Sequence, residues 1–118
     1  MKKFVLLTYQ GTTPLPGSDA WTALPEAEQK AIYADYAAMG KRAGVTPGLP
    51  LGLSSAARTV QVRDGKPQVN NGPHLAEGVG GYFVFEAENM DAAITLAAQV
   101  PAARLGGAVE IRPAEQYW

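Results

Sequence analysis

Short apolar runs rich in β-forming residues alternate with two helical patterns along this sequence. That succession restricts the chain to folds in which helices pack against a sheet. Strands are predicted at residues 3–9, 59–63, 66–70, 79–86 and 108–112, with a broken or edge strand at 45–53. Proline and glycine interrupt the 45–53 segment, and sheets tolerate proline only at edges and bulges.

The two helical patterns have recognisable start and stop signals. The first is predicted at 25–43, with Pro25 at its first position and Gly44 as its stop. The second is predicted to begin after the N-cap residue Asn89 and to end before Pro101. The residues expected on the buried faces are Ile32, Tyr36, Met39 and Ala43 in the first helix, and Met90, Ala93, Ile94, Ala97 and Ala98 in the second.

Asp64-Gly65 predicts a tight hairpin turn between the strands at 59–63 and 66–70. If this hairpin is an insertion, the remaining order is βαββαβ, which is the ferredoxin-like pattern of the α+β class. Both helices would then cover one face of an antiparallel sheet. We expect a second copy of the chain to cover the other face, because closed twofold dimers are the commonest oligomers. We therefore predict a single domain over 1–118 that forms a homodimer.

The composition excludes several classes of protein. Ten basic and eleven acidic residues are interspersed without a basic patch, so we expect no nucleic-acid partner. Cysteine is absent, which excludes disulfides, thiolate nucleophiles and iron–sulfur clusters and agrees with a cytoplasmic location. The apolar run after Lys2 and Lys3 stops at Thr8, whereas a signal peptide needs about 7–15 apolar residues. We therefore interpret this run as a buried first strand. No run of about 18 apolar residues exists, so we expect no membrane partner.

Several segments, taken in order, resemble the YCII-related (DGPF-domain) family. They are Asn71-Gly72-Pro73-His74, Gly80-Gly81-Tyr82 and Val109-Glu110-Ile111-Arg112-Pro113. The family has an Asp-Gly-Pro-Phe turn before a Gly-Gly-aromatic strand, and its chains end in a Val-Glu-Val-Arg-Pro-like strand. The resemblance implies a dimeric α+β barrel with a cleft near the subunit interface.

The resemblance implies little about activity. Most members have no assigned biochemistry, a related one catalyses dehydrochlorination of a chlorinated hydroxyquinol, and others carry a His–Asp pair suspected of catalysis. This sequence departs from the pattern at two positions: Asn71 replaces the family's Asp and His74 replaces its Phe. Asparagine cannot act as a general base, and the histidine of the His–Asp pair is missing from the first part of the chain.

His74 is the only histidine and the candidate catalytic residue. It could act as a general acid or base, since histidine titrates near about pH 6.5. The alternative is an exposed loop residue, with Glu77 nearby in sequence. A lone histidine in a chain without cysteine does not provide the ligands of a typical zinc site, so we expect no metal and no cofactor.

The candidate ligand-binding residues are Arg104, Tyr9, Asn71 and Tyr82. Arg104 could clamp an anion through bidentate hydrogen bonds, and the two tyrosines could line a pocket. The alternatives are a solvated surface arginine and tyrosines of the core or an interface. The Gln10–Ala20 loop is longer than most connections and is a further place for binding.

Other features have structural interpretations. Glu110 should point to the sheet face opposite Val109 and Ile111, with Arg112 on its own face, which predicts a structural ion pair. Gly78-Val79-Gly80-Gly81 precedes a strand, whereas a dinucleotide fingerprint precedes a helix, so we reject a dinucleotide site. The terminal aromatic pair Tyr117-Trp118 is expected to dock on a partner subunit.

Two functions remain open at this point, and a third, a haem-type dimeric barrel, is disfavoured because His74 is expected in a glycine-rich turn rather than on a helix. The first is a small-molecule-binding protein, acting as a cofactor-free lyase or isomerase on a small aromatic or acidic substrate. The second is a non-catalytic dimeric interaction or regulatory module. The surroundings of His74 discriminate between them, because a concave pocket with an arginine or a carboxylate favours the enzyme and open solvent favours the module.

Overall fold

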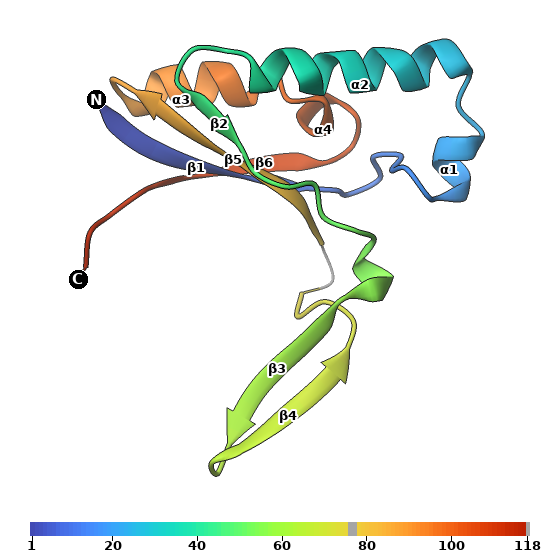
Figure 1. Ribbon diagram of the computed structural model, residues 1–118, viewed down its shortest axis with the longest axis vertical. Helices are drawn as coiled ribbons and strands as arrows, with labels where there is room; N and C mark the ends of the chain where they lie inside the picture. The colour runs from blue at the N-terminus through green and yellow to red at the C-terminus, as the bar shows by residue number, and fades with distance from the viewer. Residues whose placement is uncertain (76–77, 118) are drawn as a thin grey trace.

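A computed structural model describes residues 1–75 and 78–117 of the chain. Its helices cover one face of a four-stranded sheet, and a separate hairpin of two strands projects from the opposite side (Figure 1). The elements are β1 (Lys2–Tyr9), α1 (Asp19–Thr22), α2 (Glu26–Gly40), β2 (Val45–Pro47), a 3-10 turn (Ser54–Ala56), β3 (Arg58–Arg63), β4 (Lys66–Asn71), β5 (Val79–Ala87), α3 (Met90–Ala97), α4 (Pro101–Arg104) and β6 (Ala108–Pro113).

The four-stranded sheet has the order β2-β5-β1-β6, with each neighbouring pair antiparallel. This arrangement confirms the α+β class and is compatible with the ferredoxin-like fold. The predicted strands are all present, and the segment at 45–53 contributes only the three-residue edge strand β2. Pro47 ends that strand because it has no N–H to give to the ladder.

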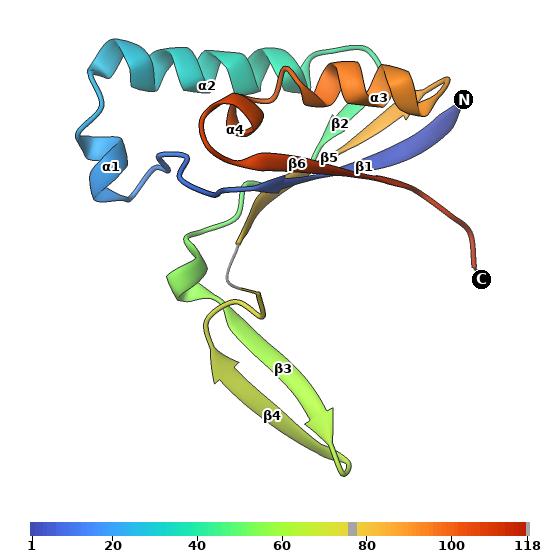
Figure 2. The ribbon, with the colours of Figure 1, turned by 180° about the vertical axis from the view of Figure 1, so that it is seen from behind.

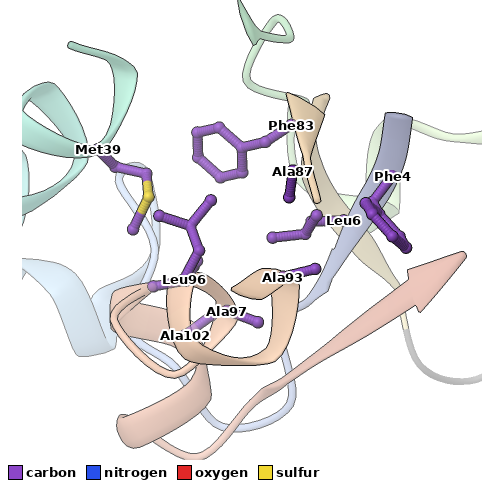
Figure 3. Packing of buried hydrophobic residues seen from close by; sticks show 10 residues of the cluster. Phe4, Leu6, Met39, Phe83, Ala87, Ala93, Leu96, Ala97 and Ala102 are labelled. Atoms are coloured by element: carbon purple, nitrogen blue, oxygen red, sulfur yellow. The ribbon is translucent and has the colours of Figure 1, made fainter. Parts of the chain in front are cut away.

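Alternate residues of β1 separate the two faces of the sheet. Phe4, Leu6 and Thr8 are buried under the helices, while Val5 and Leu7 point to the face without helices. The pairing places Leu6 opposite Phe83 of β5 and Ile111 of β6. Figure 3 shows Leu6 and Phe83 facing Met39 of α2 and Leu96 of α3 across the layer between sheet and helices.

The first predicted helix ends earlier than expected. Helix α2 stops at Gly40, and Ala43 is exposed rather than part of its buried face. Met39 is buried in the core and Tyr36 packs against it, as predicted, whereas Ile32 is only partly buried. The chain turns through a hydrogen bond from Val45 N to Arg42 O of 3.1 Å, so that β2 can begin at Val45. Gly44 does not cap the helix.

Gly44 serves the sheet instead. It has φ +82°, and a Cβ there would lie 2.7 Å from the Glu86 carbonyl oxygen of β5. The Gly44 carbonyl in turn accepts a hydrogen bond of 2.9 Å from Glu86 N. Only glycine allows both the positive φ and this close approach.

The second predicted helix begins as expected, and its buried face overlaps the predicted one but is rotated from it. Asn89 accepts a hydrogen bond from Ala92 N at 2.9 Å, which confirms the N-cap. Ala93 and Ala97 are buried as predicted, but Ala98 is exposed and Ile94 is 52% exposed. Leu96, which the pattern missed, is almost fully buried, because α3 is rotated so that this side chain points at the sheet.

The segment predicted as the Gln10–Ala20 loop contains the start of a short helix. Ser18 is the N-cap of α1, and its hydroxyl oxygen accepts a hydrogen bond from Trp21 N at 3.2 Å. Trp21 is buried and contacts the edge of Tyr33 in α2, with ring centroids 5.1 Å apart. The loop is therefore tied to α2 at its far end.

The predicted hairpin is present as β3 and β4, which form their own sheet. Its turn residues, Asp64 and Gly65, both have positive φ, at 51° and 73°, as the tight hairpin turn requires. We call residues 58–71 the hairpin arm. Figures 1 and 2 show it extending away from the rest of the molecule. Glu77 and Trp118 lie outside the described residues.

Candidate functional site

The face of the sheet that no helix of the described chain covers is the open face. It has an aliphatic centre, a tyrosine pair at one end and charged residues at its margins. The centre contains Val5, Leu7 and Val84, the tyrosines are Tyr9 and Tyr82, and the charged residues are Lys3, Glu86, Glu110 and Arg112.

Tyr9 and Tyr82 lie on neighbouring strands at the same end of the open face, where the ladder between β1 and β5 is irregular and Tyr9 pairs with Val79. Tyr82 pairs with Leu7, and Tyr9 lies two residues further along β1 on the same face. Tyr82 is 40% exposed, and its ring lies over Gly48, where a Cβ would come within 2.5 Å of it. Any side chain at position 48 would therefore displace the ring.

The glycine run before β5 makes room for Gln10. A Cβ at Gly80 would lie 2.9 Å from Gln10 Cγ, and one at Gly78 would lie 3.2 Å from Ser54 Cβ. The Gln10 backbone N–H donates a hydrogen bond of 3.1 Å to the Gly78 carbonyl. These glycines precede a strand, as predicted, and they let side chains from two other segments approach the backbone of β5.

Three buried polar atoms near the end of β1 have no hydrogen-bond partner in the described part of the chain. They are Thr8 Oγ1, Gln10 Nε2 and Thr13 Oγ1. A buried polar group without a partner is costly, so such groups in native proteins are usually satisfied by protein, water or a ligand. The same stretch of chain contains Tyr9. Sequence reasoning marked the loop but missed these three residues, since Thr and Gln give no signal by pattern alone.

Glu110 and Arg112 form the ion pair that the alternation of β6 predicts. Arg112 Nε donates to Glu110 Oε2 at 2.6 Å. The hydrogen bond to Glu110, together with the charge of that carboxylate, raises the pKa of Arg112 above its ordinary value, with a weaker contribution from Tyr9. The pairing of β6 with β1 places Arg112 on the same face as the tyrosines. The alternation of residues along β6 is the sequence signal that could have identified it as a candidate ligand residue.

Asn71 and His74 lie where the hairpin arm joins the rest of the molecule. Asn71 is the last residue of β4 and pairs with Arg58. His74 follows the turn at Gly72 and is exposed. Its side chain makes no hydrogen bond or ion pair with other residues in 1–75 or 78–117. No arginine or carboxylate of these ranges is therefore bonded to the only histidine.

Arg104 lies on the helix side of the sheet, away from the tyrosines. It ends α4 and forms an ion pair with Asp35 of α2, at the surface. Together with Arg42, which donates to the side chain of Gln99, it borders a shallow groove of about 350 Å³ whose floor includes Met39. The predicted ligand residues are therefore divided between the two sides of the sheet.

The partly buried Tyr36 lies near Arg104. Burial raises the pKa of Tyr36, while a hydrogen bond to the backbone of Ala102 and the charge of Arg104 act in the opposite direction. The ring stacks on Phe83 of β5, with centroids 6.4 Å apart. Tyr36 thus joins α2 to the core.

Within residues 1–75 and 78–117, no group of three or more histidine and acidic side chains is placed to hold a metal ion. In the same part of the chain, no helix has the length and apolar character needed to cross a membrane.

Comparison with known proteins gave one family. A search of curated proteins found no match. The family model described as the YCII-related domain matches residues 3–116. The match covers nearly the whole chain, including the sheet, the helices, the hairpin arm and both tyrosines of the open face. The protein therefore belongs to the YCII-related domain family.

Proposed function

We propose that the protein forms a homodimer through its open face and binds a small aromatic or acidic molecule at the tyrosine end of that interface. The observation that carries the proposal is the uncovered aliphatic centre formed by Val5, Leu7 and Val84. Burying such a surface against a second sheet about 10 Å away removes it from water. The charged margins contain both signs, so the face is suited to meet a copy of itself.

The chemistry of the tyrosine end supports the choice of ligand. The rings of Tyr9 and Tyr82 offer stacking surfaces, and their hydroxyls can donate and accept hydrogen bonds. Arg112 on the same face can bind a carboxylate or phenolate, with Glu110 released to solvent or to the partner.

A non-catalytic interaction or regulatory module is the second candidate function, and the exposure of His74 favours it. A general acid or base must lie within hydrogen-bond reach of the proton that it moves. His74 is exposed, and a partner copy packed beside it would supply the groups that hold a substrate within this reach. Catalysis of a lyase or isomerase type by His74 therefore depends on the homodimer.

The dimer can be tested by sedimentation velocity over a range of concentrations. Val84→Lys places a charge at the centre of the open face and should convert the dimer to a monomer. The matched control is Ile94→Lys, at an exposed aliphatic residue on α3, which should leave the dimer intact. If both variants stay dimeric, the open face is not the interface.

The ligand can be sought by thermal shift with phenols, quinols and short carboxylic acids at several pH values. A ligand at 100 times its dissociation constant adds about 2.7 kcal/mol of apparent stability. Tyr82→Ala and Arg112→Ala should abolish the shift, whereas Arg104→Ala, on the other side of the sheet, should retain it. If only Arg104→Ala abolished the thermal shift, the ligand would bind in the groove beside α2 and not at the tyrosine end. A dimer without any ligand response would favour the interaction module.

A further inference from the structure

The hairpin arm has one polar face and one face that is apolar except at its base, where Arg58 pairs with Asn71. The register pairs Val60 with Val69 and Val62 with Pro67, so these four residues lie together. Val60, Val62 and Val69 are 60%, 67% and 62% exposed. The polar face is formed by Thr59, Gln61, Arg63, Lys66, Gln68 and Asn70. We call the surface formed by Val60, Val62, Pro67 and Val69 the valine face.

The arm lacks support from the rest of the described chain. It forms a separate two-stranded sheet and makes no more than marginal contact with other strands or helices. The radius of gyration is 16.0 Å, compared with about 13.5 Å for a compact domain of this length. An isolated two-stranded hairpin is at best marginally stable in water. A surface outside the described chain is therefore needed to cover the valine face.

The position and length of the arm indicate where that surface lies. The arm and the helices extend on opposite sides of the four-stranded sheet, so the arm lies on the side of the open face (Figures 1 and 2). Its strands of six residues span roughly 20 Å, about twice the spacing of two packed sheets. A second copy seated on the open face would therefore lie within reach of the arm.

The distribution of charge favours the same partner. The arm contains Arg58, Arg63 and Lys66 against Asp64, a net charge of +2. Because the whole chain carries −1, the remainder carries −3. Opposite net charges attract the arm of one copy toward the body of another.

We propose that the hairpin arm is a clasp that packs its valine face on a second copy of this chain, with the two arms exchanged reciprocally. The inference rests on the proposed homodimer and adds a second contact to it, separate from the open face. The arm's base would then bring Asn71 and His74 next to the partner subunit, so that the exposed histidine becomes part of a site built from two chains.

The first test measures the dimer dissociation constant of a valine-face variant. Val60→Thr/Val62→Thr/Val69→Thr keeps β-branched residues but replaces a methyl with a hydroxyl at each position. We expect the constant to rise at least about tenfold, since the apolar area of both arms is affected. The control Gln61→Thr/Gln68→Thr alters only the polar face and should leave the constant unchanged.

The outcomes separate the clasp from the open-face interface. If the valine-face variant matches the wild type while Val84→Lys dissociates, the clasp is wrong and the open-face dimer stands. If the valine-face variant dissociates while Val84→Lys does not, the clasp stands and the open-face interface is wrong. A wild-type chain that is monomeric at all concentrations contradicts both.

A second test needs no loss of stability. Because the chain has no cysteine, Gln68→Cys introduces a single attachment point for a nitroxide on the polar face of the arm. Mixed with ¹⁵N-labelled wild-type protein, it should broaden amide signals of the partner's four-stranded sheet and helices. The control label at Ala34→Cys, on the exposed side of α2, should not. An absence of intermolecular broadening from the arm label in a dimeric sample would overturn the proposal.

Discussion

The two faces of the four-stranded sheet are made from alternate residues of the same strands, yet they differ in what covers them. On β1, Phe4 and Leu6 are buried by the helices, while Val5 and Leu7 are only half-buried on the open face. The two sets of side chains are equally apolar. The difference shows that apolar character selects the residues for burial, whereas the placement of the helices decides which of them are buried within one chain.

The largest effect that separates the faces is expected from a pair of alanine substitutions. Leu6→Ala should lower the free energy of unfolding by about 2–5 kcal/mol, because it leaves a cavity in a fully buried layer. Leu7→Ala should cost less in dilute protein and approach the Leu6 value only as the concentration rises. Chemical denaturation at several protein concentrations measures both. Equal losses in a proven monomer would mean that the open face is already covered.

The cap of α3 offers a smaller effect on the covered face. Asn89→Ala removes the acceptor for Ala92 N and should cost about 1 kcal/mol of folding stability. Asn70→Ala changes an exposed asparagine of the hairpin arm and should leave the unfolding midpoint unchanged. If the two substitutions lower the free energy of unfolding equally, the Asn89 side chain does not stabilise α3 as an N-cap.

Tyr36 gives the covered face a dependence on pH. Because burial raises its folded pKa above the unfolded value, its contribution to stability is present below the ordinary tyrosine pKa of about 10. That contribution is lost as the pH rises through the folded pKa. Between pH 8 and 11, Tyr36→Phe should therefore lose less stability than the wild type. Tyr33→Phe, at a 55% exposed tyrosine, should follow the wild-type curve.

The smallest effect is expected at the margin of the open face. Glu110→Gln breaks a surface ion pair with Arg112, and exposed pairs contribute little to folding. The unfolding curve of the monomer should match that of the wild type within experimental error. A larger loss that appears only in the dimer, and that shrinks with added salt, would place this pair inside the interface.

Local patterns predicted more of the fold than of the candidate site. The strands, the hairpin turn at Asp64-Gly65, the Asn89 cap and the Glu110–Arg112 pair each depend on neighbours in sequence or on alternation. The predicted end of α2 was wrong because the pairing of β2 with β5 determines where the helix stops. The predicted buried face of α3 was partly wrong because contact with the sheet determines how the helix is rotated. The candidate ligand residues were predicted from separate chain segments, and such a prediction cannot tell which side of the sheet each residue lies on. It therefore grouped Arg104 with the tyrosines of the opposite side.

The sequence by itself determined the α+β class, the order of elements and the family, because hydrophobic periodicity, turn residues and motif order are properties of short stretches. Tertiary structure alone decided that Tyr9, Tyr82 and Arg112 share the open face while Arg104 lies among the helices. It also decided that the valine face of the hairpin arm stands uncovered. These are relations between distant segments, and only the packing of the helices on one side of the sheet establishes them.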